Sequence, residues 1–458
     1  MNLIKNNDNQ QFYKTLLTLS LPIIFQNFVS SSLNMVDTIM IGSLGESAIA
    51  AVGLANQLFF LLILIIFGIN NGAAVFIAQF YGNGNYKEIK KTMGIGLILG
   101  TIVSFVFYFF GFFFPNQIMK ILINNNQNVI DMGVEYLRIV SWSYIFMAIS
   151  FSFSVASRAI GKTFIPAVVS AVSLVINAIL NYILIFGKLG FEPMGVRGAA
   201  YGTLIARIIE FVVLIFFIYK ENGVLAAKPK ELANFSKPFL KKYFNKALPV
   251  IMNETFWALG TVFYAIAIAK ISSDAIAVFQ VSNTIFRFYE VIFIGFASAT
   301  QVMIGTNIGA NNELMAKKYA FMLIKIAQIF CVITIIIMMP LIPVLNSFFN
   351  LSPDVYEMAN KTLKVFMYFS FFKVFNLMMI VGVLRGGGDT KFAMLLEIGS
   401  VWFIGVTMAF LGAVVLKLPV NIVVSMIMLE EVIKFVFGFY RLRSMKWLNN
   451  VILGMEQI

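Results

Sequence analysis

Long apolar runs separated by short polar stretches make up most of the chain from Leu16 onward. Each run is about 20 residues or longer, which is the length that an α-helix needs to cross the hydrocarbon core of a bilayer. We therefore predict an all-α membrane protein with twelve transmembrane helices. The predicted spans are residues 15–37, 48–76, 92–114, 132–156, 164–186, 196–219, 246–269, 275–304, 319–341, 357–383, 392–416 and 420–440.

The polar stretch from Lys220 to Lys246 is the longest between two runs, and it is rich in lysine. Lys and Arg are concentrated in cytoplasmic loops of membrane proteins, so we expect this stretch and both termini on the cytoplasmic side of a bacterial inner membrane. The stretch also divides the predicted spans six and six. We therefore predict an N-terminal six-helix bundle over residues 1–220, a linker over 221–245 and a C-terminal six-helix bundle over 246–458.

The second half of the chain repeats the first at a constant offset, the one that separates Pro22 from Pro249, and no gap is needed. We call this distance along the chain the repeat offset. Further pairs at the repeat offset include Asn56 with Asn283, Gly82 with Gly309, Lys90-Lys91 with Lys317-Lys318, and SRAIGKT from Ser157 with LRGGGDT from Leu384. Because each half has six spans, both halves begin on the same side of the membrane. The two bundles are then expected to be related by a pseudo-two-fold axis along the membrane normal, as in one class of transporters.

Composition narrows the function further. Only 12% of the residues are charged, against about 25% in soluble proteins. The net charge of +13 is explained by basic loops, so we expect no nucleic-acid partner. A single cysteine, Cys331, and the absence of histidine exclude a disulfide framework, a cysteine metal cluster, a Ser-His-Asp triad and a histidine proton relay. Without a nucleotide-binding motif either, we expect no enzyme and no cofactor, and an ion gradient of Na⁺ or H⁺ as the energy source.

Glu254 is the acid that stands out, because it follows Asn253 in the apolar segment ALPVIMNETFWALGT. A carboxylate inside a bilayer costs about 2.5–3.5 kcal/mol or more, and such residues are functional by default. Asp389 is the second candidate of this half, although it follows three glycines and also fits a solvated turn. We predict that Glu254 and Asp389 bind the coupling cation, with Na⁺ as one candidate.

In the first half, Asp37 ends the first predicted span and can be either an exposed helix-end acid or a cation ligand. Asn177 and Asn181 are spaced i, i+4, so both amides lie on one face of their helix. Such amides can hold helices together or coordinate Na⁺. With Asp37 as a third oxygen donor they form the alternative Na⁺ site.

Further acids lie within the predicted spans. Arg207 with Glu210, and Arg287 with Glu290, are spaced to form local ion pairs. Glu430 and Glu431 are close to Lys434 in sequence, whereas Glu397 has no opposite charge within one turn. Acids that outnumber their local partners predict a cavity for cations. Aromatic side chains suit a pocket for flat organic cations. The predicted cavity residues are Gln26, Asn253, Trp257, Tyr264, Asn283, Tyr289 and Glu397.

Several motifs resemble the multidrug and toxic compound extrusion (MATE) family of bacterial transporters, within the superfamily that also holds oligosaccharidyl-lipid and polysaccharide flippases. The motifs are SLPIIFQN around Pro22, VDTIMIG with Asp37, IAQFYGNGN, the NAILN pair, GVRGAAYGT, and the second-half echoes at Pro249 and LRGGGDT. The resemblance implies that Asp37, Asn177, Asn181 and Thr203 form a cation site, and that Glu254 and Asp389 match the acids of one branch. Some relatives have Asp where Asn181 stands, which leaves the choice of Na⁺ or H⁺ open.

The resemblance implies a cation-coupled antiporter that exports cationic, amphipathic drugs by alternating access. The alternative is a flippase for a lipid or a lipid-linked oligosaccharide on the same fold. A flippase cavity for a diphosphate is expected to be cationic, and the acids described above argue against it. We expect organic cations and the lipid bilayer as partners, and a monomer.

Overall fold

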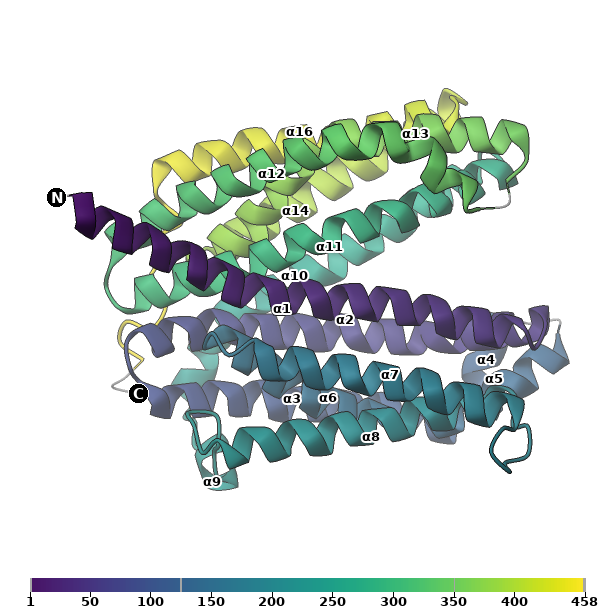
Figure 1. The fold of residues 1–458 in the computed structure, drawn as a ribbon, viewed down its shortest axis with the longest axis horizontal. Helices are drawn as coiled ribbons and strands as arrows, with labels where there is room; N and C mark the ends of the chain where they lie inside the picture. The colour runs from purple at the N-terminus through teal and green to yellow at the C-terminus, as the bar shows by residue number, and fades with distance from the viewer. Residues whose placement is uncertain (1, 124–125, 350, 456–458) are drawn as a thin grey trace. The chain divides into compact units, whose positions relative to one another are not determined.

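The computed structural model describes residues 2–123, 126–349 and 351–455, with side chains from residue 10 onward, and these ranges consist of helices and their connecting loops, with no strand. The α-helices are α1 (Asn2–Gly42), α2 (Glu46–Gly82), α3 (Tyr86–Phe113), α4 (Pro115–Leu122), α5 (Gln127–Val140), α6 (Ser143–Ala159), α7 (Phe164–Phe186), α8 (Val196–Lys220), α9 (Pro229–Leu232), α10 (Lys237–Ala269), α11 (Ser273–Gly309), α12 (Glu313–Ser347), α13 (Pro353–Leu377), α14 (Thr390–Ser400), α15 (Thr407–Phe410) and α16 (Val420–Ser444). Three π-helical segments continue them, namely η1 (Met378–Leu384), η2 (Val401–Val406) and η3 (Leu411–Val415). Figure 1 shows the helices of each compact unit.

Each of the twelve predicted spans coincides with helical structure. Among the described residues, ten helices are long and apolar enough to cross a membrane, and an eleventh span results if α5 and α6, bent by 49°, count as one. The twelfth predicted span is α16, which is 25 residues long but carries Glu430, Glu431 and Lys434 in its interior. The prediction of an all-α, multi-pass membrane protein is confirmed.

The chain forms two compact units. The N-terminal unit comprises Leu21–Ile77 and Asn85–Tyr243, and in it α7 packs on α8, α8 on α5 and α6, and α3 on α6. Its apolar core includes the fully buried Leu62, Leu137 and Tyr144.

The C-terminal unit comprises the chain from Phe244 onward together with the beginning of α1, up to Ser20, and the end of α2, Ala78–Gly84. Helix α13 packs against α11, α12 and α16 in this unit. The core is built from aromatic side chains such as Phe286 and Phe366, whose rings stack 5.2 Å apart. The boundaries of these units differ from the predicted bundle boundaries at 220 and 246, because α1 and α2 contribute residues to both units.

The helices preserve the repeat offset of the sequence. Helix α2 begins and ends at Glu46 and Gly82, and α11 begins and ends at Ser273 and Gly309, so both ends of the two helices are separated by the repeat offset. Helix α3 begins at Tyr86 and α12 at Glu313, again at the same offset. The repeat is therefore a repeat of structure as well as of sequence.

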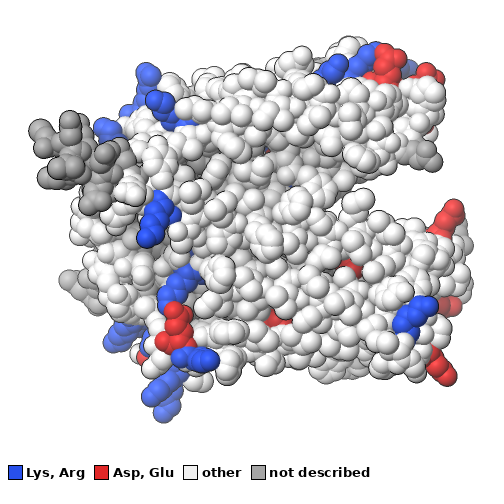
Figure 2. Space-filling view, in the orientation of Figure 1, with Lys and Arg blue, Asp and Glu red and all other residues white. Residues whose placement is uncertain are grey.

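Charged side chains gather toward the helix ends, while the sides of the helices are largely uncharged in the view of Figure 2. Exposed apolar side chains cover these sides, including Phe105 and Phe109 on α3 and Ile336 and Ile337 on α12. In a bilayer such surfaces contact lipid tails, so their exposure is the normal state of a membrane helix.

Candidate functional site

Asp37 is bound by an amide in the N-terminal unit. The Asn181 side chain of α7 donates a hydrogen bond to the Asp37 carboxylate of α1 over 3.0 Å. Helix α1 continues to Gly42, so Asp37 does not end the helix as we expected, and it lies more than one turn inside. Two residues that are far apart in the sequence are thus in direct contact.

Asn177 and Thr203 extend this group of oxygen atoms. Asn177, one turn before Asn181 on α7, donates to the Thr203 hydroxyl of α8 over 3.4 Å. The Tyr136 hydroxyl of α5 donates to Asn56 over 3.4 Å and interacts with Thr203 as well. We call Asp37, Asn177, Asn181, Thr203 and Tyr136 the Asp37 cluster. It joins four helices of one unit.

The Asp37 cluster contains an unsatisfied acceptor. The side-chain oxygen of Asn181 is buried and accepts no hydrogen bond from the described residues, although Asn181 is only 2% exposed. A buried polar atom without a partner is costly, and it calls for an explanation such as a bound ion or water. Gly202 of α8 makes room for this oxygen, because a Cβ there would collide with it. The donor set therefore fits a Na⁺ ion, which takes oxygen ligands.

Glu254 has a different environment in the C-terminal unit. Its carboxylate forms an ion pair with Arg385 over 2.6 Å, and both side chains are nearly buried, at 12% and 4% exposure. Arg385 also donates to the side-chain oxygen of Asn253 over 3.3 Å, and Asn253 donates to the carbonyl of Ala393. A cation that binds Glu254 would have to compete with the Arg385 guanidinium.

Asp389 is held in a similar way. It follows Gly388, whose φ of +73° completes the turn that the three glycines predicted. The Asp389 carboxylate accepts a 2.7 Å hydrogen bond from Arg441 of α16. Glu254 and Asp389 thus pair with different arginines, and their cation binding stays a prediction.

The arginine–amide contact near Glu254 occurs in both repeats. Arg158 and Gln26 correspond to Arg385 and Asn253 at the repeat offset, and Arg158 donates to Gln26 over 3.4 Å. The position that corresponds to Glu254 is Asn27, so the first repeat has an amide there instead of a carboxylate. Both repeats therefore have the arginine and a side-chain amide in contact with it, but only the second repeat has a carboxylate at the next position.

The remaining predicted cavity residues lie in several environments. Tyr264 is buried and donates to Glu430, and Glu397 forms a 2.8 Å ion pair with Lys434. Tyr289 is buried against Cys331, Ser370 and Thr334. Trp257 is 41% exposed and Asn283 is half-buried. The structure therefore joins Tyr264 and Glu397 in one network, while Tyr289 belongs to a separate group of hydroxyl and thiol side chains.

One predicted ion pair is wrong and one is confirmed. Arg207 and Glu210 pair over 2.7 Å, as their spacing on α8 predicts. Glu290, in contrast, pairs with Lys373 of α13 over 2.9 Å rather than with Arg287. Arg287 is exposed on α11, whereas Lys373 reaches Glu290 across the packed interface of α11 and α13.

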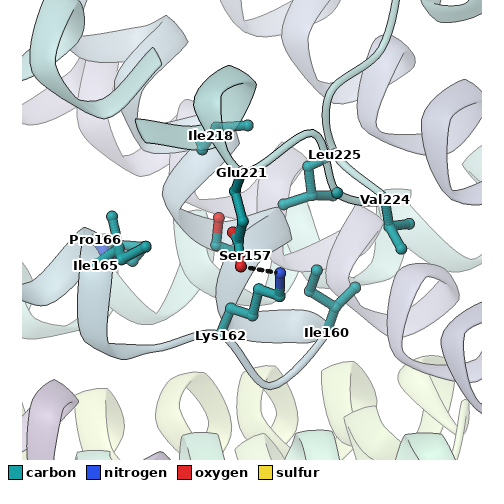
Figure 3. A pocket seen from close by; sticks show the side chains of 10 residues that line it. Ser157, Ile160, Lys162, Ile165, Pro166, Ile218, Glu221, Val224 and Leu225 are labelled. Atoms are coloured by element: carbon teal, nitrogen blue, oxygen red, sulfur yellow. Dashed lines mark hydrogen bonds and ion pairs between the residues drawn. The ribbon is translucent and has the colours of Figure 1, made fainter. Parts of the chain in front are cut away.

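A small hollow lies elsewhere in the N-terminal unit. It is lined mainly by apolar side chains, including Ile160, Pro166, Ile218 and Leu225, beside the ion pair of Lys162 and Glu221 (Figure 3). The residues that line it do not include any of the predicted site residues. We assign no part of the site to this hollow.

Sequence reasoning missed the basic partners of Glu254, Asp389 and Glu397. Arg441 lies 52 residues from Asp389, Lys434 lies 37 residues from Glu397, and Arg385 lies on a different helix from Glu254 and far from it in the chain. One signal was present, because Arg385 stands in the repeated motif LRGGGDT. An arginine in two copies of a motif indicates a structural contact that both copies need.

Comparisons with known proteins agree with this architecture. The MatE family model matches the chain twice, over residues 22–183 and 249–411, and the starts of the two matches are separated by the repeat offset. A protein from Bacillus subtilis described as probable multidrug resistance protein YoeA is 26% identical over 87% of this chain and 86% of its own length. Probable multidrug resistance protein NorM from Thermotoga maritima is also 26% identical, over 89% of this chain and 87% of its own length.

A crystal structure of a MATE protein in complex with MaL6 has the same fold. Its TM-score is 0.86 at 20% sequence identity, over 94% of this chain and 97% of the other. The two matches of the family model cover well over half of the residues, one in each structural repeat. The chain therefore belongs to the MatE family of membrane transporters.

Proposed function

We propose that this protein exports cationic, amphipathic compounds in exchange for an inward flow of Na⁺ or H⁺, by alternating access. The observation that carries the proposal is the Asp37 cluster. It places a carboxylate, two amides and two hydroxyls together inside membrane-spanning helices, with the buried oxygen of Asn181 unsatisfied by the described residues. Ionisable groups at such positions typically bind ions or relay protons.

The relatives support the choice of substrate. The proteins from Bacillus subtilis and Thermotoga maritima are both described as probable multidrug resistance proteins. The acids within the helices of both units suit a cationic substrate better than an anionic one. On this basis we also propose that the protein is not an enzyme, is a monomer, and lies in a bacterial inner membrane with both termini in the cytoplasm.

Coupling follows from competition between the ion and the substrate. If the ion binds the Asp37 cluster better in one facing state and the substrate binds better in the other, then each shifts the population toward its own state. This differential affinity couples the two movements, and the gradient of the ion supplies the free energy that drives export. In this mechanism Asp37 holds the ion, while Asn177, Asn181 and Thr203 supply neutral oxygen atoms around it.

Ethidium efflux from cells that lack native drug pumps tests the proposal. We would compare buffers with Na⁺ and with K⁺ at a fixed proton gradient, and then add a protonophore. Dependence on Na⁺ identifies a sodium antiporter, whereas collapse with the protonophore alone identifies a proton antiporter. No efflux in either buffer, from a protein that is inserted in the membrane, contradicts drug export and favours the flippase alternative.

A further inference from the structure

A second group of charges is buried in the C-terminal unit, outside the Asp37 cluster. The Lys434 ammonium of α16 lies 2.8 Å from Glu397 of α14, 3.4 Å from Glu430 and 3.5 Å from Glu431. All four residues are at most 8% exposed. We call these four residues the Lys434 cluster. One ammonium group has three N–H donors, and here it faces three carboxylates.

The surroundings do not balance this excess of acids. From the helices packed around the cluster, the titratable groups that face it are Tyr264 of α10, Glu290 of α11 and Lys373 of α13. Glu290 and Lys373 pair with each other, and Tyr264 is neutral. The adjoining segments η1, η2, α15 and η3 contain no charged residue. Two more carboxylates than ammonium groups are therefore enclosed within membrane helices.

Neighbouring polar groups are arranged around the acids. Tyr264 donates to Glu430, and the Asn376 amide donates to Glu431 over 2.7 Å. The other end of the same amide, the Asn376 oxygen, is buried and accepts no hydrogen bond from the described residues, although Asn376 is only 3% exposed. An acceptor without a donor, beside an excess of carboxylates, indicates that this group of side chains can accommodate one more proton.

The backbone also makes room for this arrangement. Gly405 lies in the π-helical segment η2, and a Cβ there would collide with the Tyr264 hydroxyl and with Glu430. Single π-helical turns within α-helices are often found at functional sites. The contact of Tyr264 with Glu430 therefore depends on a glycine in an irregular turn.

The Lys434 cluster shares one position with the Asp37 cluster of the first repeat and lies beside a second. At the repeat offset, Tyr264 corresponds to Asp37, Glu430 to Thr203, and Lys434 to Arg207. The acid on the first helix of the first repeat, Asp37, is thus replaced by a tyrosine in the second repeat, and the hydroxyl on the last helix, Thr203, is replaced by an acid. Both repeats place acid chemistry at the junction of these helices, with different side chains.

We propose that the Lys434 cluster is a proton-binding site that takes up and releases one proton, shared among Glu397, Glu430 and Glu431, and that this proton is a coupling ion of transport. The coupling rests on the proposed function, whereas the proton binding does not. Uptake converts one carboxylate to a carboxylic acid, and its new O–H can donate to an unsatisfied acceptor. The proton relieves the repulsion between like charges held in a medium of low polarity.

A metal ion is the less suitable ligand. Lys434 already occupies the centre of the carboxylates, and no group of three or more metal-ligating side chains is arranged for a metal among the described residues. A proton needs no coordination shell, and it can be shared between carboxylates that titrate as a group.

Infrared spectroscopy of the purified full-length protein tests proton binding without any transport. We would follow the carbonyl band of protonated carboxyl groups across a pH titration in detergent. The expected result is a band that disappears as the pH rises in the wild type and is lost in Glu430→Gln and in Glu397→Gln. Glu210→Gln is the matched control, because Glu210 is a buried carboxylate with its own arginine. A titrating band that persists in both cluster variants overturns the proposal, and two substitutions at different helices guard against misfolding of one.

Proteoliposomes separate this proposal from the function on which its coupling rests. We would measure ethidium transport driven by an imposed proton gradient, with the wild type, Glu397→Gln and Glu210→Gln side by side. Loss of proton-driven transport in Glu397→Gln, with transport retained in Glu210→Gln, supports coupling at the Lys434 cluster. Wild-type proton dependence in Glu397→Gln overturns it. If the wild type itself moves no ethidium, the proposed function fails, and the infrared result alone decides proton binding.

Discussion

The two repeats of this chain place their acids in different chemical environments. In the N-terminal unit, Asp37 receives a hydrogen bond from a neutral amide, Asn181. In the C-terminal unit, Glu254, Asp389 and Glu397 each form an ion pair with Arg385, Arg441 or Lys434. The two repeats thus have equivalent helices, but the charged side chains on these helices differ. One unit thus surrounds an acid with neutral amide and hydroxyl groups, whereas the other pairs its acids with basic side chains and still holds more carboxylates than ammonium groups in the Lys434 cluster.

The largest expected effect is on ethidium efflux, and it follows from a substitution of Asp37, the acid that binds the Asn181 amide. Asp37→Asn removes the negative charge that the proposed ion neutralises, so we predict loss of coupled ethidium efflux with the protein still inserted in the membrane. Efflux from cells with matched expression measures this. Asp131→Asn is the control, since Asp131 is an exposed acid bound by Gln127. Efflux at the wild-type rate in Asp37→Asn would place the coupling ion elsewhere.

The next largest effect is on stability, and it differs between Arg385 and Arg158, the two arginines at equivalent positions of the repeats. Arg385→Leu leaves the Glu254 carboxylate nearly buried without its partner, so we predict a loss of about 3–5 kcal/mol in the free energy of unfolding. Arg158→Leu leaves only the Gln26 amide without its donor, and we predict a loss of about 1–3 kcal/mol. Thermal or denaturant unfolding in detergent measures both.

A double variant separates the ion pair of Glu254 from the arginine–amide contact. Glu254→Gln in the Arg385→Leu background removes the unpaired charge, so it should recover part of the lost stability. Equal losses in the two single variants, with no recovery in the double variant, would show that the ion pair of Glu254 adds nothing to the arginine–amide contact.

Smaller losses of stability are expected from substitution of two glycines, one in each repeat. Gly202→Ala would push a methyl group into the Asn181 amide, and Gly405→Ala would push one into the Tyr264 hydroxyl. We predict that each costs about 1–3 kcal/mol of stability, as overpacking typically does. Gly399→Ala is the control, because a Cβ there meets nothing within 4 Å. Melting temperatures unchanged in all three variants would mean that neither site is tightly packed.

The smallest effect is expected at the turns that connect the middle spans of each repeat. Lys162 and Glu221 pair on the surface, with side chains 41% and 44% exposed, so Lys162→Met should cost about 0–1 kcal/mol. The corresponding position, Asp389, binds Arg441 with only 10% and 21% exposure. Arg441→Met should therefore cost more than Lys162→Met in the same unfolding assay. The reverse order would indicate that burial does not set the strength of these pairs.

The sequence predicted the helices well, because bilayer thickness dictates the length of each apolar run. It also predicted the pair of Arg207 and Glu210, which are neighbours on one helix. It could not predict that Glu290 binds Lys373, or that Glu254 binds Arg385, since these pairs join helices far apart in the chain. Such contacts depend on which helix faces pack together, and hydropathy does not encode that. The motif resemblance grouped Asp37, Asn177, Asn181 and Thr203, and the structure shows Asp37 in contact with Asn181 and Asn177 in contact with Thr203, while their binding of a cation stays a prediction.

The constant offset between α2 and α11 restricts how the sequence of this protein can change. A single inserted residue would turn the rest of a helix by about 100° and advance it by about 1.5 Å. In a bilayer that rotation would carry buried groups such as the Lys434 cluster toward lipid, where no water can solvate them. Insertions and deletions inside these helices are therefore far more damaging than substitutions. Side chains at equivalent positions of the two halves differ, as Asp37 and Tyr264 show, whereas the number of residues between equivalent positions is the same.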